Sequence, residues 1–412
     1  MAPSRVRWWV LAVGLLAQTF TSMLQFGLPF LHPQLFSLAG SSAEIAALLI
    51  AAPSVGLVAS LFAWGWVADR HGERPAMVLG LGSGALALGS LALLLGARQY
   101  TPVPVVWWGL FLSSALLASV NSASGRLILS WFPLHERGLA MGIRQTSQPL
   151  GIAFAAALFP LAAQGSGFHA PLGMVALGCA GAALLVVSTV PALAAASVSA
   201  HFTEAGRGPL RSPYARSPIW RMHGASALLT VAQFLLSVFG FVYLVSAQHW
   251  DPVAAGLFFT ATGLAGAVMR VLMGWCSDRL GSRLHPLRWI AIALLLLLGM
   301  LSALAHAPAA AAPEPTSLVL ERALLAALFM ATVLSSSNNG LSYTLVAEYA
   351  GQRWAGRALG AQNTAQNAVA AVVPPLGALF LGAAGFGGLF LLGAVAAGTA
   401  ALALPPSSRP SR

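Results

Sequence analysis

The chain has 412 residues, of which 58% are hydrophobic and only 8% are charged, and its mean hydropathy is +0.79. Soluble domains carry about 25% charged residues, so this composition excludes a set of soluble domains and indicates a polytopic membrane protein. All 21 basic residues are arginine and the formal net charge is +11. The arginines lie mostly between the apolar stretches, which argues against a nucleic-acid partner.

Twelve apolar stretches follow one another along the chain, each near the roughly 20 residues that a spanning helix needs. The first half is expected to form helices near 8–31, 45–67, 76–97, 103–130, 139–163 and 171–195. The second half is expected to form helices near 222–246, 253–275, 287–306, 318–346, 357–380 and 387–404. No alternating barrel pattern appears, so the sequence predicts an all-α membrane protein.

One long polar segment separates the two sets of six spans. Residues 197–221 are rich in Pro, Gly, Ser and Arg, which is typical of a linker. The sequence therefore predicts a bundle over 1–196, a cytoplasmic linker over 197–221 and a second bundle over 222–412.

The arginines also predict how the chain is oriented. With twelve spans, both termini share one side, and that side holds Arg70, Arg137, Arg207 and most other loop arginines, whereas Arg98 lies opposite. Cytoplasmic loops carry such an excess of basic residues. Arginine without lysine, together with abundant alanine, suggests a GC-rich bacterial genome. We expect an inner-membrane protein with both termini in the cytoplasm.

Two short signatures each occur once in either half of the chain. GWVADRHGERP (Gly65 to Pro75) and GWCSDRLGSRLHP (Gly274 to Pro286) share G-W-x-x-D-R-x-G-x-R at an offset of 209 positions. GLAMGIRQTSQ (138–148) and GRALGAQNTAQ (356–366) share G-x-A-x-G-x-x-x-T-x-Q at an offset of 218 positions. Such repetition in an apolar chain indicates a transporter built from two related halves.

At these residues the chain resembles the major facilitator superfamily, over nearly its whole length. The resemblance implies two pseudo-symmetric bundles of six helices and transport by alternating access. The signature follows helices two and eight; its glycines would let helices approach closely, and its carboxylates and arginines would close the cytoplasmic side. Alternatively, the arginines only enforce topology. The expected gating residues are Gly65, Asp69, Arg70, Arg74, Gly274, Asp278, Arg279 and Arg283.

The resemblance further implies that helices one, four, seven and ten line a central cavity. Gln18 and Gln233 are repeat partners at an offset of 215 positions, and Asn121 and Asn339 are partners at an offset of 218. Such polar faces either line a substrate path or hydrogen-bond helices to one another, and the sequence leaves both open. The expected polar ligands are Gln18, Gln25, Gln233, Asn121, Asn339 and Gln362.

Three arginines are expected within the spans, where a charge is costly and usually functional. Arg126 lies near the end of helix four, Arg144 lies about 10 Å into helix five, and Arg270 lies in helix eight. A guanidinium can hold a carboxylate through two parallel hydrogen bonds. These side chains are therefore expected to bind substrate, unless they pair with acids of the cytoplasmic gate or reach the interface.

Arg270 resembles the helix-eight arginine of oxalate, monocarboxylate and nitrate porters of the superfamily. Nitrate porters carry a second arginine in helix two, where this chain has Leu61. We therefore expect a small organic anion, such as a carboxylate, as the substrate.

A multidrug/proton antiporter is the alternative function. Drug/proton antiporters of the superfamily usually carry G-x-x-x-G-P-x-x-G-G in helix five, and that element is missing from GIRQTSQPLGIAFAAALFP. No Asp, Glu or His lies near the middle of a predicted span. The coupling therefore stays open between Glu321 or Glu348, a proton carried by the substrate, anion exchange and uniport.

Motifs of enzymes are missing, since neither HExxH, nor G-x-S-x-G, nor a metal-spaced Cys/His cluster occurs. We expect no catalytic residue, no metal and no cofactor. The expected partners are an anionic small molecule and the lipid bilayer, without nucleic acid, and the protein is expected to be a monomer. A substrate-sensing receptor on the same fold is disfavoured by the short tail after Leu404.

Overall fold

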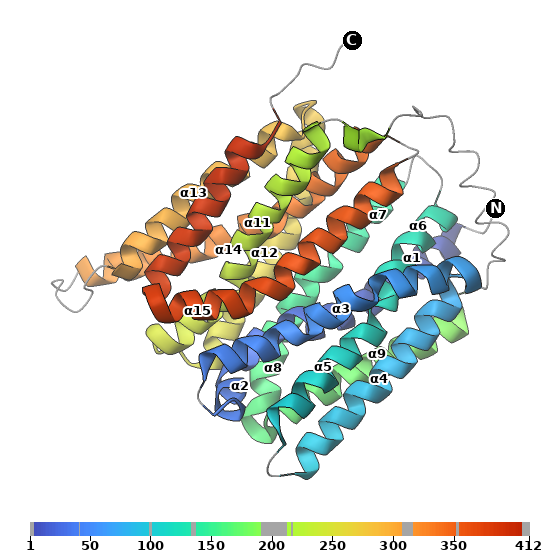
Figure 1. The fold of residues 1–412 in the computed structure, drawn as a ribbon, viewed down its shortest axis with the longest axis horizontal. Helices are drawn as coiled ribbons and strands as arrows, with labels where there is room; N and C mark the ends of the chain where they lie inside the picture. The colour runs from blue at the N-terminus through green and yellow to red at the C-terminus, as the bar shows by residue number, and fades with distance from the viewer. Residues whose placement is uncertain are drawn as a thin grey trace. The chain divides into compact units, whose positions relative to one another are not determined.

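A computed structural model describes residues 4–40, 42–98, 101–132, 137–190, 212–215, 217–306, 316–351 and 354–405. Its described residues are helical and contain no strand (Figure 1). The chain divides into two compact units. The first contains Met1–Gly206 and Pro252–Thr260, and the second contains Arg207–Asp251 and Ala261–Arg412.

The first unit carries the first six predicted spans. Three of those spans are each built from more than one helical segment, because a short turn interrupts the helix. The helices are α1 (Ser4–Gly27), η1 (Leu28–Leu31), α2 (His32–Leu38), α3 (Ala43–His71), α4 (Glu73–Ala97), α5 (Val103–Leu117), α6 (Ser119–Trp131), α7 (Arg137–Gln145), α8 (Ser147–Ser166) and α9 (His169–Thr189).

Within this unit α1 packs against α8 and α9, α3 packs against α5, and α4 packs against α5 and α9. Gly151 marks the closest approach of α8 to α1. A Cβ at Gly151 would lie 2.6 Å from the Cβ of Ser22 and 2.8 Å from the carbonyl oxygen of Thr19. A small residue is required there, as is usual where membrane helices touch.

The second unit carries the remaining spans, although Pro252–Thr260, the start of one of their helices, belongs to the first unit. Its elements are η2 (Pro213–Ala215), α11 (Ser217–Val242), a π-helical turn η3 (Tyr243–Ala247), α12 (Pro252–Arg279), α13 (Leu284–His306), α14 (Thr316–Ala350) and α15 (Ala355–Ala403). α11 packs against α14 and α15, and α13 packs against the same two helices. α11 begins at Ser217, inside the segment predicted as linker, because its apolar face already packs from Ile219 onward.

The helix α15 bends back on itself at Gly385, whose φ of 66° and ψ of −177° are not helical (Figure 1). A positive φ of this kind suits glycine, which has no Cβ to clash. Eleven helices of the described chain are long and apolar enough to cross a membrane. The bend turns the last of these into two spans, which confirms the twelve predicted spans and the all-α membrane fold.

The repeated signature forms the last turns of α3 and α12 rather than a loop. Gly72 and Gly281 follow these helix ends with φ values of 91° and 59°, so both require glycine. A Cβ on Gly65 or Gly274 would meet no described atom within 4 Å, so neither glycine marks a close helix contact among the described residues.

Candidate functional site

In the first unit, polar side chains from three helices meet around Gln18 of α1. Its Nε2 donates to Asn121 Oδ1 of α6, and Ser124 Oγ lies 3.4 Å from Gln18 Oε1. Arg144 of α7 donates from Nε to Ser124 Oγ at 3.0 Å and from Nη2 to the carbonyl oxygen of Asn121 at 3.3 Å. The structure thus brings together three predicted site residues, Gln18, Asn121 and Arg144.

Apolar packing holds this polar cluster in place. Leu11 of α1, Phe132 after α6 and Ala140 of α7 are buried against one another, with Ile143 packed beside them. Ile143 precedes Arg144, so burying it fixes the direction in which the arginine points. The guanidinium is therefore aimed at α6 by the apolar face of its own helix.

Arg144 and Ser124 also supply the polar edge of a small cavity, which is otherwise lined by apolar residues of α1 and by Phe132. Its volume is about 10 Å³, room for about one water molecule. A carboxylate group needs more space than this cavity provides.

In the second unit, the repeat-related side chains form a longer hydrogen-bonded chain. Asn339 Nδ2 of α14 donates to Gln233 Oε1 of α11 at 3.2 Å, which repeats the Gln18–Asn121 pair. Gln366 of α15 donates to Asn339 Oδ1 at 3.2 Å and to Ser226 Oγ of α11 at 2.9 Å. Gln362 Nε2 also donates to Ser226 Oγ. All five side chains are buried, so their mutual bonds satisfy groups that lipid would not.

His223 and Tyr214 extend this chain toward the start of α11. His223 Nδ1 lies 2.5 Å from Gln362 Oε1, and His223 Nε2 lies 3.3 Å from the Tyr214 hydroxyl. The imidazole and phenol rings are stacked, with centroids 5.9 Å apart. Burial raises the pKa of Tyr214, so its hydroxyl stays protonated near neutral pH.

Arg270 of α12 lies against α14 and is only 6% exposed. Its Nε and Nη2 both donate to the carbonyl oxygen of Ser336, at 3.1 and 2.5 Å. That edge of the guanidinium, which could hold an oxyanion through two bonds, is occupied by backbone in this structure. Arg270 therefore clamps α12 to α14.

The remaining predicted ligands are placed as follows. Gln25 is buried on α1, and Arg126 belongs to α6, but its side chain lies outside the described residues. On α14 and α15, Tyr343 donates to Asn363 Oδ1 at 3.0 Å, and Asn367 donates to the same oxygen at 3.1 Å. The polar face of α15 thus bonds within the second unit.

The predicted gating arginines contact aromatic rings, carbonyls and one acid. Arg70 and Arg279 lie over the rings of Trp66 and Trp275, at 5.5 and 4.2 Å. Arg74 donates to the carbonyl oxygen of Val187 at 2.6 Å. The side chains of Asp69 and Asp278 lie outside the described residues.

The signature arginine of the second unit forms an ion pair. Arg283 Nε lies 2.6 Å from Glu348 Oε1 of α14, and Arg283 also donates to Ser277 at 3.1 Å. Both partners of the pair are substantially exposed, so the bond contributes at most about 1 kcal/mol. It is weak enough to break in a conformational change.

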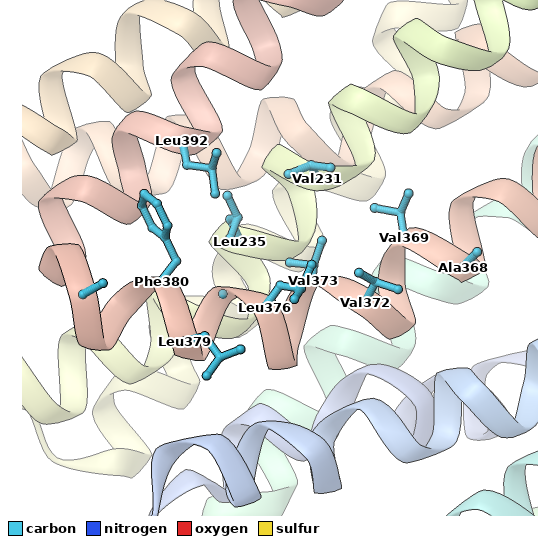
Figure 2. Close-up of a pocket in the computed structure, with 12 residues that line it drawn as sticks. Val231, Leu235, Ala368, Val369, Val372, Val373, Leu376, Leu379, Phe380 and Leu392 are labelled. Atoms are coloured by element: carbon cyan, nitrogen blue, oxygen red, sulfur yellow. The ribbon is translucent and has the colours of Figure 1, made fainter.

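A cavity in the second unit is apolar and has a volume of about 730 Å³. Figure 2 shows side chains of α11 and of both arms of α15 converging on it, among them Leu235, Leu376 and Leu392. Pro374 and Pro375 lie inside α15 beside this cavity, and each removes one backbone hydrogen-bond donor from the helix. This cavity offers an anion almost no polar contact.

Three contacting residues were not expected from the sequence: Ser124, Ser226 and His223. A helical periodicity could have indicated them, because Ser124 follows Asn121 by three residues, and His223 and Ser226 share the face of Gln233. The sequence could not have indicated the apolar cavity, because residues that face a cavity and residues that face lipid are equally apolar. Among the described residues, no group of three or more His, Cys, Asp or Glu is placed to hold a metal ion.

Repeat-related helices with buried polar faces are typical of transporters built from two related halves. Residues 10–374 match the family model of the Major Facilitator Superfamily. The chain therefore belongs to this superfamily and is a multi-pass membrane transporter.

The relatives agree with this assignment. An uncharacterized MFS-type transporter of Mycobacterium tuberculosis (strain ATCC 25618 / H37Rv) is 39% identical over 373 residues, covering 90% of this chain and 78% of the relative. Probable anion transporter 3, chloroplastic, of Oryza sativa subsp. japonica is 26% identical over 259 residues, covering 55% and 48%.

Solved structures show the same fold. A bacterial homologue of the human lysosomal transporter Spinster matches with a TM-score of 0.72 at 13% identity, covering 98% of this chain and 95% of that one. The xylose transporter XylE from E. coli matches with a TM-score of 0.71 at 14% identity, covering 96% and 98%.

Proposed function

We propose that this transporter carries a small organic anion of the carboxylate class by alternating access between its two halves. The observation that carries the proposal is Arg144, whose guanidinium donates to Ser124 Oγ and to the Asn121 carbonyl oxygen of α6 within a chain that has few charges. A cation in a spanning helix is costly and is usually retained for function. The similarity to a probable anion transporter of rice, over part of each chain, supports the same substrate class.

The other elements of the proposal follow from the sequence. The halves are residues 1–196 and 222–412, joined by 197–221, in an inner membrane with both termini in the cytoplasm. Arg144 is the principal anion ligand, and Ser124 and Asn121 orient it, with Gln18 bonded to both of these residues. The signature residues form the cytoplasmic gate, with Arg283 and Glu348 as one breakable contact. The carrier acts as a monomer.

The test measures binding of small carboxylates to the purified protein, using oxalate, malonate and succinate in thermal-shift and uptake assays. Arg144→Gln keeps a hydrogen-bonding side chain but removes the charge, and charged hydrogen bonds contribute about 1.5–3 kcal/mol. We expect affinity to fall roughly 10- to 100-fold. Arg98→Gln is the matched control, because Arg98 is exposed at the end of α4. Equal carboxylate affinity in wild type and Arg144→Gln would refute the role of Arg144.

The apolar cavity favours a second candidate, a carrier of lipophilic compounds. Its volume of about 730 Å³ lies within the range of sites for drug-sized ligands. In this case Leu235→Trp, which fills the cavity, reduces transport of lipophilic cations and leaves carboxylate binding unchanged. Binding of lipophilic cations without any response to carboxylates would favour this function over the first.

A further inference from the structure

We propose that His223 is the proton-binding site through which this transporter is coupled to pH, and that its protonation favours the anionic substrate. The cargo in this statement rests on the proposed function, whereas the proton site does not. His223 lies half-buried near the start of α11, at one end of the hydrogen-bonded chain that leads to Gln233. Ten residues of helix separate the two, a distance of about 15 Å.

The contacts of the imidazole allow it to gain and lose one proton without losing a partner. An amide oxygen can only accept, so Nδ1, at 2.5 Å from Gln362 Oε1, carries a hydrogen in both states. Nε2 faces the Tyr214 hydroxyl, which can donate or accept. The hydroxyl donates to the neutral ring and accepts from the cation. Only the Tyr214 hydrogen has to turn when the proton binds.

Gln362, the partner of His223 Nδ1, connects the imidazole to the buried polar side chains of the second unit. Gln362 donates to Ser226, Gln366 donates to Ser226 and Asn339, and Asn339 donates to Gln233. Hydrogen bonds arranged in series polarise one another, and the series that starts at His223 runs through Gln362 to Ser226, which accepts from both Gln362 and Gln366. A positive charge at His223 therefore acts on Gln362 and Ser226, at the edge of the polar cluster that corresponds to the Gln18 cluster of the first half.

The internal repeat shows which position of the first half corresponds to the site of this charge. Gln362 is the partner of Arg144 at an offset of 218 positions, so the second half lacks a permanent cation where the first half has one. Protonated His223, in contact with Gln362, restores a positive charge next to that position. Histidine is the side chain that ordinarily changes charge between pH 5 and 8. Lower pH therefore raises anion affinity, and higher pH removes the added charge.

Several other groups near His223 can titrate or carry charge, including Arg221 of α11 itself, which donates to carbonyl oxygens of residues 402–404. On the described elements that pack against α11, these groups are Tyr214 on η2, Tyr243 on η3, Arg357 on α15, and Glu321, Arg322, Tyr343, Glu348 and Tyr349 on α14. Arg357 lies over the Trp354 ring at 5.1 Å, and Glu348 pairs with Arg283. Tyr343 donates to Asn363. Arg357, Glu348 and Tyr343 therefore have partners other than His223. The groups that bond the imidazole directly are the Tyr214 hydroxyl and the Gln362 side chain.

The first experiment needs no substrate. The full chain is labelled with ¹⁵N-histidine in lipid nanodiscs, and its spectra are followed from pH 5 to 8 for wild type and His223→Gln. The signal that the variant lacks belongs to His223. We expect Nδ1 to stay protonated throughout while Nε2 gains its proton on acidification. A ring that stays neutral from pH 5 to 8, or an unprotonated Nδ1, overturns the proposal.

A second variant tests the role of the hydroxyl. Tyr214→Phe removes the acceptor of the cation and the donor to the neutral ring. Because the charge-assisted bond is the stronger of the two, the cation loses more, so Nε2 should gain its proton at a lower pH. An unchanged titration in Tyr214→Phe contradicts the assigned contact.

The second experiment measures coupling in proteoliposomes that contain a pH-sensitive dye. Addition of oxalate, malonate or succinate outside should carry protons inward in wild type. His223→Gln keeps an N–H donor for Gln362 but cannot titrate, so proton influx should fall at least tenfold. His285→Gln, exposed at the start of α13, should match wild type.

The outcomes separate the two proposals. Carboxylate transport with equal proton influx in wild type and His223→Gln overturns the proton site and leaves the anion function standing. A titrating His223 in a protein that carries none of the three carboxylates sustains the proton site and refutes the carboxylate cargo.

Discussion

At the scale of single residues, each half contains a hydrogen bond between two side-chain amides that joins facing helices. Gln18 donates to Asn121 in the first unit, and Asn339 donates to Gln233 in the second. The sequence left open whether these residues line a path or join helices, and in this structure they do join helices. Around the shared pair the halves diverge, since one adds Arg144 and the other adds Gln362 and His223.

A double-mutant cycle on Gln233→Leu and Asn339→Leu measures the strength of this pair. Hydrogen bonds between membrane helices average about 0.6 kcal/mol and reach about 1.7 kcal/mol. We expect a coupling energy in that range from unfolding of the purified protein in mixed detergent micelles. A cycle of Gln233→Leu with the distant Arg98→Gln should give no coupling. Strictly additive effects of Gln233→Leu and Asn339→Leu would contradict the bond.

At the scale of elements, close packing depends on a few small residues. Gly151 sets the contact of α8 with α1, where a Cβ would meet Ser22 and the backbone of Thr19. Backbone cannot move aside as a flexible side chain does. Such positions decide which helices touch, and hence which polar faces meet.

Replacing Gly151 should therefore destabilise the first unit. For Gly151→Val we expect a loss of about 1–3 kcal/mol, typical of overpacking, seen as a lower melting temperature in detergent. Gly165→Ala in the same helix is the control, because a Cβ there meets nothing within 4 Å. If both variants melt like wild type, the close contact of α8 with α1 is wrong.

At the scale of the whole molecule, arginine placement predicts the topology. Arg98 and His285 are both exposed and are expected on opposite sides of the membrane. Single cysteines at Arg98→Cys and His285→Cys, in a Cys179→Ala, Cys276→Ser background, should react differently with an impermeant maleimide. We expect labelling at position 98 in intact spheroplasts and at position 285 only after lysis. The reverse pattern would place the termini outside.

The sequence by itself determined the class of fold. Twelve apolar stretches and a signature repeated at Gly65 and Gly274 are local properties, and lipid permits only helices for such stretches. It also indicated which residues are polar within the spans, because a charge such as Arg144 stands out against an apolar background.

Only the tertiary structure decided what those polar residues touch. Arg270 turned out to bond the Ser336 carbonyl, and His223 turned out to bond Gln362, 139 positions along the chain. A repeat offset shows which positions of the two halves are equivalent, but it does not show which helices are in contact. Contacts depend on the rotation and closeness of each packed pair, which steric details such as Gly151 against α1 set in three dimensions.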